Sequence, residues 1–128
     1  MRNYRKPLQI IYILLVLLTI WLINPVMAGG GDQNAAKQAW PMIENGALLI
    51  DVRSKKEFEG GHLEGAVNIE WDQIDALAAT IGSDKQRQVV LYCRSGNRVG
   101  KSIAILETKG YSNLFNATGL EALKATRP

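Results

Sequence analysis

Short apolar runs alternate along this chain with stretches whose apolar residues recur at helical spacing. The runs predict buried strands over residues 47–52, 66–69, 88–92 and 114–115. The helical spacing predicts helices over residues 33–44, 54–58, 71–81, 99–109 and 119–126, most of which end at a glycine. Pro41 lies inside the first of these helices and is expected to break or restart it. Strands and helices that alternate in this way predict an α/β fold with a mainly parallel central sheet flanked by helices.

The first 28 residues have the layout of an export signal. Three basic residues precede a 16-residue apolar stretch from Leu8 to Ile23, and residues 26–28 offer the small side chains that a signal peptidase requires. Cleavage after them would leave residues 29–128 as one domain. The apolar stretch is slightly long for a signal core and short for a membrane span, so an uncleaved anchor is the alternative. Both cases place the domain outside the cytoplasmic membrane, and we expect a bacterial periplasm.

The excess of positive charge belongs to this leader. The chain has 15 Lys and Arg against 12 Asp and Glu, and three of the basic residues but no acidic ones lie in residues 1–28, so 12 of each remain. A balanced domain gives no reason to expect nucleic-acid binding. Its length is sufficient for one modest core.

Cys93 is the only cysteine and directly follows the predicted strand 88–92. An exported chain with one cysteine has no internal disulfide, so its thiol is either buried and inert or exposed for a chemical reason. In open α/β sheets, ligands bind at the carboxyl ends of strands, where loops lead into helices. Cys93 occupies such a position, which is the first reason to expect a chemical role.

The loop that follows, Arg94-Ser95-Gly96-Asn97-Arg98, is suited to hold an anion. Backbone N–H groups can turn inward ahead of the next helix, whose dipole adds positive potential, and Gly96 permits the conformation required. Arg94 and Arg98 add two permanent cations. All of these favour the thiolate of Cys93, a good nucleophile, and would stabilise a persulfide on it. We therefore expect anionic sulfur in a solvent-reachable pocket, since arginines would be costly to bury beside an inert thiol.

Four polar residues upstream are expected to support this loop. His62 is the only histidine, and a reaction that starts from a thiolate requires no general base, so we expect His62 to form a polar network with Arg53 or Glu57. Asp51 ends its strand at the same sheet edge as the loop. We expect it to pair with Arg98 or to accept N–H groups of the loop.

Two stretches of the sequence carry a family likeness. One reads Leu49-Ile50-Asp51-Val52-Arg53 and continues through Glu57-Phe58, Gly61-His62 and Gly65-Ala66-Val67-Asn68-Ile69; the other reads Tyr92-Cys93-Arg94-Ser95-Gly96-Asn97-Arg98. In order and spacing they resemble the motifs of the rhodanese family, in particular its small exported single-domain thiosulfate sulfurtransferases. The resemblance covers nearly all of residues 29–128 and implies a rhodanese-like domain there.

The resemblance also implies a mechanism. Cys93 would attack the outer sulfur of thiosulfate, release sulfite and pass the sulfur from a persulfide to cyanide or a thiol, a protein thiol included. Arg94 would orient the donor, and the backbone amides of residues 94–98 would hold the sulfur. Ser95 either donates to the donor's oxygens or stabilises the turn, and Asn97 is expected to tolerate left-handed backbone angles. No metal or organic cofactor is implied.

Loop length and the C-terminal residues bear on how far the resemblance extends. Four residues separate Cys93 from Arg98, whereas related phosphatases and arsenate reductases have five, so the loop suits a sulfur better than a phosphate. Two non-enzymatic hypotheses keep the fold: a module that binds a protein or stores sulfur, and a membrane-anchored persulfide donor. The retained thiol argues against a module that only binds. Many family members have Gly-Gly and an aromatic residue near the C-terminus, where this chain has Thr118-Gly119-Leu120, so we expect the acceptor side of the pocket to differ.

Overall fold

The computed structural model describes residues 10–13, 15–16 and 31–128. Most of the predicted leader, with its cleavage site, lies outside these residues. In the part of the chain that is described, no helix is both long and apolar enough to cross a membrane.

Among the described residues, four parallel strands form one sheet in the order β2-β1-β3-β4. Their bounds are β1 (Leu48–Asp51), β2 (Val67–Asn68), β3 (Val89–Cys93) and β4 (Leu114–Gly119). Every residue of β3 is buried, because this strand has a neighbour on each side and helices over both faces. The predicted α/β class with a parallel sheet is confirmed.

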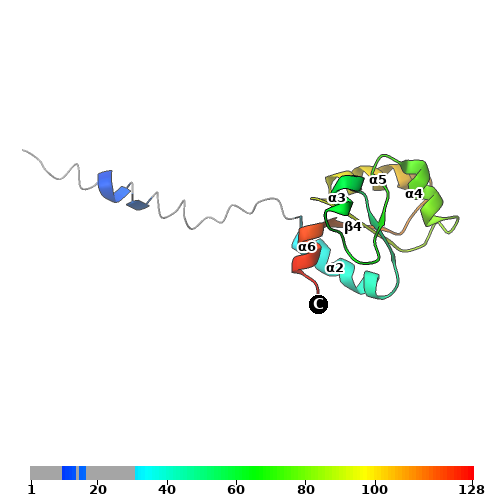
Figure 1. Ribbon diagram of the computed structural model, residues 1–128, viewed down its shortest axis with the longest axis horizontal. Coiled ribbons are helices and arrows are strands. Elements are labelled where there is room, and N and C mark those ends of the chain that lie inside the picture. Colours follow the sequence, from blue (N-terminus) through cyan, green and yellow to red (C-terminus); the bar gives the residue numbers. More distant parts are fainter. Residues whose placement is uncertain (1–9, 14, 17–30) are drawn as a thin grey trace, which may run out of the picture.

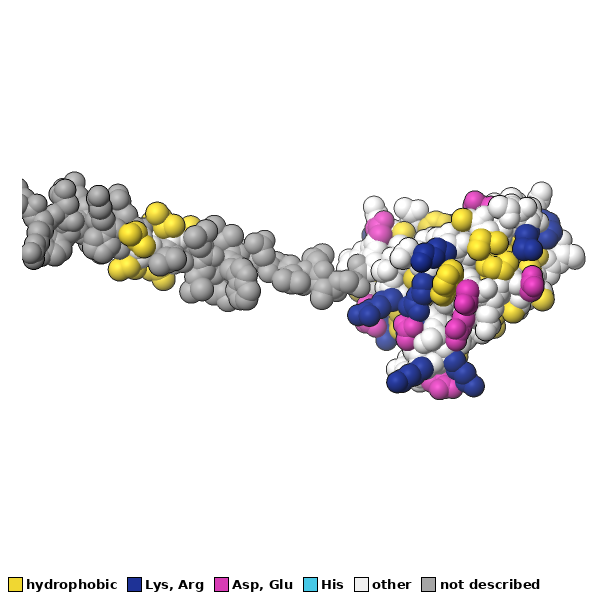
Figure 2. Space-filling view, turned by 90° about the horizontal axis from the view of Figure 1, so that it is seen from above, with side chains coloured by type: hydrophobic (Ala, Val, Ile, Leu, Met, Phe, Trp, Pro, Cys, Tyr) yellow, Lys and Arg dark blue, Asp and Glu magenta, His cyan; other side chains and the backbone are white. Residues whose placement is uncertain are grey.

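Helices cover both faces of the sheet (Figure 1). On one face, α2 (Gln33–Glu44) and α6 (Leu120–Ala125) enclose a core with β1, β3 and β4. On the other, α4 (Ile74–Ile81) and α5 (Asn97–Thr108) enclose a second core. The short helix α3 (Lys55–Glu59) connects β1 to β2. Basic and acidic side chains are interspersed on the visible surface of the domain (Figure 2).

The alternation of side chains along the strands assigns residues to these two cores. Ile50, Leu91 and Cys93 pack in the core beneath α4 and α5. Tyr92 lies in the opposite core, and Asp51 is its register partner on the neighbouring strand, so Asp51 shares the face of Tyr92. The carboxylate of Asp51 and the sulfur of Cys93 are therefore on opposite faces of the sheet.

The expected break at Pro41 is wrong, because α2 continues through it to Glu44. Proline removes one helical hydrogen bond, and packing of the helix compensates for that loss. Ala39 and Trp40 are buried, and Trp40 Nε1 donates to Leu123 O at 3.1 Å. Tertiary contacts with α6 thus hold α2 together.

Three element boundaries differ from the predictions by two residues or more. The helix predicted from residue 71 begins at Ile74. Trp71 lies in a turn before it, and the Trp71 N–H donates to Val52 O at 3.1 Å. The helix predicted from residue 99 begins at Asn97, which brings its N-terminus closer to Cys93. The last strand extends to Gly119 rather than ending at residue 115.

Candidate active site

Cys93 is the last residue of β3, and α5 begins four residues later. The backbone N–H of Gly96 donates to Cys93 Sγ at 3.1 Å. Gly96 has a φ of 94°, the left-handed conformation that glycine adopts without strain, and it is the N-cap of α5. The first N–H groups of a helix have no acceptor within that helix, and the helix dipole adds positive potential there. The sulfur therefore lies where the backbone favours negative charge.

The side chain of Cys93 is buried, with a residue exposure of 1%. The expectation that the sulfur itself is solvent-reachable is thus wrong, although a loop amide does turn toward it. The reason is that the loop folds over the end of β3, leaving its own side chains outside. Arg94, Ser95 and Asn97 are exposed and form the solvent-facing rim of the loop that contains the buried sulfur.

The two arginines of the loop differ in their partners. Arg98 forms a bidentate ion pair with Glu57, with Nη1–Oε1 and Nη2–Oε2 distances of 2.8 and 3.0 Å. Arg94 is exposed and forms no ion pair or side-chain hydrogen bond with the described residues. The uncompensated positive charge of the rim is therefore that of Arg94.

The pair between Glu57 and Arg98 fixes α3 against the loop. The hydrogen bonds from Arg98 lower the pKa of Glu57 to about 2, with a further contribution from Ser54. Ser54 caps α3 and forms a reciprocal capping box with Glu57. The same hydrogen bonds raise the pKa of Arg98, with smaller contributions from Cys93. Glu57 is thus ionised and preorganised for Arg98 at neutral pH.

Asp51 contacts neither Arg98 nor the loop amides, so both expectations for it are wrong. It is fully buried and binds Arg53 instead, with an Nη2–Oδ2 distance of 2.7 Å and a second bond to the Arg53 backbone N–H at 2.9 Å. Burial lowers the pKa of Arg53, but the bonds to Asp51 outweigh this effect and leave that pKa raised. Arg53 also donates to Gly61 O at 2.7 Å. This pair organises the loop between β1 and β2 on the face opposite the sulfur.

His62 contacts neither Arg53 nor Glu57, so the expected polar network is also wrong. Its Nδ1 lies 2.8 Å from Phe58 O, and the two rings stack with centroids 3.6 Å apart. Asn97 is not left-handed either, because it begins α5 and Gly96 takes that conformation. Ser95 is exposed, and its hydroxyl bonds to none of the residues described.

Sequence reasoning missed Asn116 in β4. Its Nδ2 donates to Gly96 O at 3.0 Å, so it contacts the loop directly. A polar residue near the carboxyl end of a predicted parallel strand is a signal for such a contact. That signal was hidden because the strand was predicted to end at residue 115.

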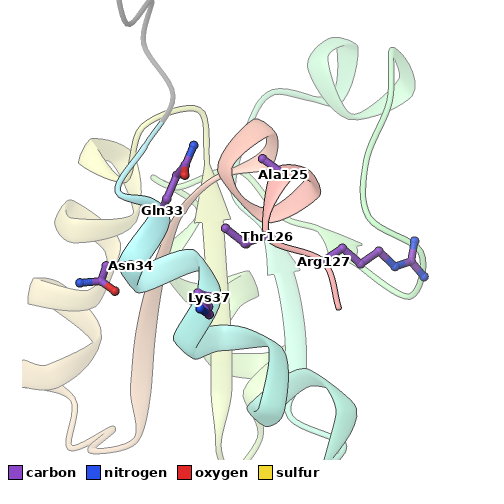
Figure 3. Close-up of a pocket in the computed structure, with 6 residues that line it drawn as sticks. All are labelled: Gln33, Asn34, Lys37, Ala125, Thr126 and Arg127. Carbon is purple, nitrogen blue, oxygen red and sulfur yellow. The ribbon is translucent and has the colours of Figure 1, made fainter.

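A separate pocket lies between the start of α2 and the end of α6 (Figure 3). It is lined by Gln33, Asn34, Lys37, Ala125, Thr126 and Arg127. None of these residues belongs to the Cys93 loop, and both helices cover the sheet face opposite Cys93. In the described ranges, no three His, Cys, Asp or Glu side chains are grouped as metal ligands.

Comparison with known proteins identifies the family. The rhodanese-like domain matches residues 35–125. The thiosulfate sulfurtransferase PspE of Escherichia coli K12 is 36% identical over 72 residues, covering 56% of this chain and 69% of that protein. The solved structure of an E. coli rhodanese with anions is 34% identical, with a TM-score of 0.55, and the match covers 59% of this chain and 89% of that one. The chain belongs to the rhodanese-like domain family.

The family also has members with other roles. The tRNA uridine(34) hydroxylase of Photorhabdus laumondii is 30% identical over 94 residues, which cover 70% of this chain. They cover 27% of the hydroxylase, so the chain spans about a quarter of that relative's length. What the site of this chain does therefore has to be argued from its own residues.

Proposed function

We propose that this chain is a thiosulfate sulfurtransferase that carries a sulfane sulfur on Cys93. The observation that supports it most directly is the 3.1 Å hydrogen bond from the Gly96 N–H to Cys93 Sγ. This bond brings a backbone N–H group against the sulfur, in a loop that leads into a helix N-terminus. Both a thiolate and a persulfide would be stabilised there. The likeness to PspE agrees with this activity.

The first half-reaction conserves atoms and charge. The Cys93 thiolate uses an electron pair to bond the outer sulfur of thiosulfate. The bond between the two sulfurs of thiosulfate breaks, and its electrons leave with sulfite. Cys93 then carries a persulfide anion, and no proton is transferred. This agrees with the position of the only histidine, His62, whose Nδ1 faces a backbone carbonyl.

The second half-reaction restores the enzyme. Cyanide, or a thiolate on a small molecule or a protein, attacks the outer sulfur of the persulfide. The sulfur–sulfur bond breaks, its electrons return to Cys93, and thiocyanate or a new persulfide leaves. No cofactor takes part in either step.

Arg94 binds the sulfonate end of the donor in this proposal. It is the uncompensated cation of the rim, because Arg98 is paired with Glu57. The sulfonate can stay at the exposed rim beside Ser95 and Asn97 while the outer sulfur alone approaches Cys93. Such an arrangement reconciles a buried nucleophile with a charged donor, since the charged sulfonate group need not be desolvated.

Mass spectrometry of the protein after treatment with thiosulfate tests the proposal. The wild type is expected to gain one sulfur atom and to lose it to cyanide, whereas Cys93→Ser gains none. A folded wild type that gains no sulfur contradicts the proposal. A wild type that gains sulfur but does not produce thiocyanate repeatedly is a sulfur carrier and not an enzyme.

We also propose that the domain acts outside the cytoplasmic membrane, in the periplasm. Support comes from the basic start, apolar stretch and small residues of positions 1–28. Fractionation of cells that express the full chain, with mass determination of its N-terminus, tests this. An N-terminus at residue 29 in the periplasmic fraction supports cleavage, an intact chain in the membrane fraction supports the anchor, and cytoplasmic protein contradicts both.

A further inference from the structure

The conformation of Gly96, whose N–H points at Cys93 Sγ, is constrained from the neighbouring strand β4. Gly96 O accepts two hydrogen bonds, from the Gly100 N–H at 2.9 Å and from Asn116 Nδ2 at 3.0 Å. Gly96 has no side chain, so its backbone angles are set only by contacts of this kind. The N–H of Gly96 lies in the preceding peptide plane, which is joined to its carbonyl through the φ and ψ angles of Gly96. The two bonds to the carbonyl restrict ψ, and close packing limits other changes, since a Cβ added to Gly96 would lie 3.1 Å from Asn116 Oδ1 and 3.2 Å from Thr118 Cα. With φ held at 94°, the N–H points toward Cys93 Sγ.

The side chain of Asn116 is itself fixed. Its Oδ1 accepts the Thr118 N–H at 3.0 Å while its Nδ2 donates to Gly96 O. A carbonyl can only accept and a backbone N–H can only donate, so these two partners determine the orientation of the amide. The loop also packs closely against the end of β4, since a Cβ added to Gly119 would clash with Arg94 O.

Thr118 shows that this arrangement is under strain. Of the described residues other than glycine, it is the one with a positive φ, at 66°, and it lies where the register between β3 and β4 shifts. A threonine in this conformation is strained because its Cβ crowds the following carbonyl oxygen. The conformation is held by the Thr118 hydroxyl, which donates to Asp32 O at 3.1 Å. Strain that is maintained beside a reactive residue indicates a functional requirement.

We infer that Asn116 is a positioning residue for sulfur transfer, acting through the backbone conformation of Gly96 to hold anionic sulfur on Cys93. This inference rests on the proposed sulfurtransferase function. Asn116 touches neither donor nor acceptor in this role. Its effect is therefore on the stability of the thiolate and the persulfide, and not on donor binding at Arg94.

The test compares Asn116→Asp with Asn113→Asp. The first change replaces the amide donor to Gly96 O by a carboxylate oxygen, which repels that carbonyl. The control makes the same change of charge just before β4, where Asn113 Nδ2 donates to Gln86 O at 3.1 Å and lies away from the loop. We expect Asn116→Asp to lower kcat about 10-fold and to leave KM for thiosulfate nearly unchanged. The control should match the wild type.

A second readout does not depend on sulfur transfer. The rate at which iodoacetamide alkylates resting Cys93 is measured over a range of pH. The midpoint of this pH dependence should lie at higher pH in Asn116→Asp than in Asn113→Asp. Equal kcat values and equal midpoints overturn the inference. If Asn116→Asp does not fold, Asn116→Ala, which removes both bonds without adding charge, decides by the same criteria. A wild type that forms no persulfide contradicts the proposed function. The alkylation midpoints would still show whether Asn116 affects Cys93.

Discussion

Replacing Glu57 by Gln should destabilise the domain in a way that depends on pH. Glutamine keeps the shape of the side chain and can still accept from Ser54 in the capping box, so the change mainly removes one charge. Arg98 then loses its ion-pair partner beside Cys93. The variant therefore isolates the electrostatic part of the contact between α3 and the loop.

The size of the effect follows from the pKa. In the folded protein the pKa of Glu57 is lowered from the usual 4.5 to about 2, mainly by its hydrogen bonds with Arg98. Such a shift nominally corresponds to about 3 kcal/mol. The Glu57 side chain is 34% exposed and that of Arg98 26%, so solvent screening reduces this to about 1 kcal/mol. A folded pKa below the unfolded one means that the stabilisation is complete above 4.5 and disappears as the pH falls toward 2.

Urea denaturation of the wild type, Glu57→Gln and Glu59→Gln tests this expectation. Glu59 is the matched control because it lies on α3 and is 63% exposed, with Lys55 Nζ at 3.9 Å. Glu57→Gln should lose about 1 kcal/mol near neutral pH, and the loss should shrink steadily on acidification. Glu59→Gln should differ little from the wild type. A loss for Glu57→Gln that is as large in acid as at neutral pH would refute the ion-pair reasoning.

Three further changes probe other parts of the site. Gly46→Ala, at a φ of 94° with open space around it, should cost about 1–2 kcal/mol in thermal melts. Gly96→Ala, at the same φ, should cost more because its Cβ would lie 3.1 Å from Asn116 Oδ1, and it alone should lower kcat; equal kcat values would deny Gly96 a role. Arg94→Ala should raise KM for thiosulfate about 5-fold, as the loss of a roughly 1 kcal/mol contact predicts, and should leave the melting temperature unchanged. The control Arg127→Ala, also at an exposed arginine, should leave KM unaltered. Asp51→Asn should destabilise by about 3 kcal/mol in urea titrations because it leaves a buried arginine charge uncompensated, and a loss below about 1 kcal/mol would contradict that account.

Local chemistry explains which features could be predicted. The apolar runs identified each strand, and the capping residue Ser54 located α3, because both signals lie within a few residues. The loop after Cys93 could be recognised for the same reason, since Gly96 and the arginines follow the cysteine directly. The starts of α4 and α5 were less accurate because tertiary contacts decide them. Tertiary contacts also carry α2 through Pro41, where the buried Trp40 bonds to Leu123.

The sequence by itself determined the fold class, the loop that carries the chemistry and its single thiol, since these depend on neighbours along the chain. Only the tertiary structure decided which residues from elsewhere contact that loop. Strand register placed Asp51 on the face opposite Cys93, and packing of α3 paired Glu57 with Arg98. The extension of β4 brought Asn116 to Gly96. The apolar pattern does not encode these contacts, because strands that are buried on both faces are continuous apolar runs and do not mark which side chain points to which face.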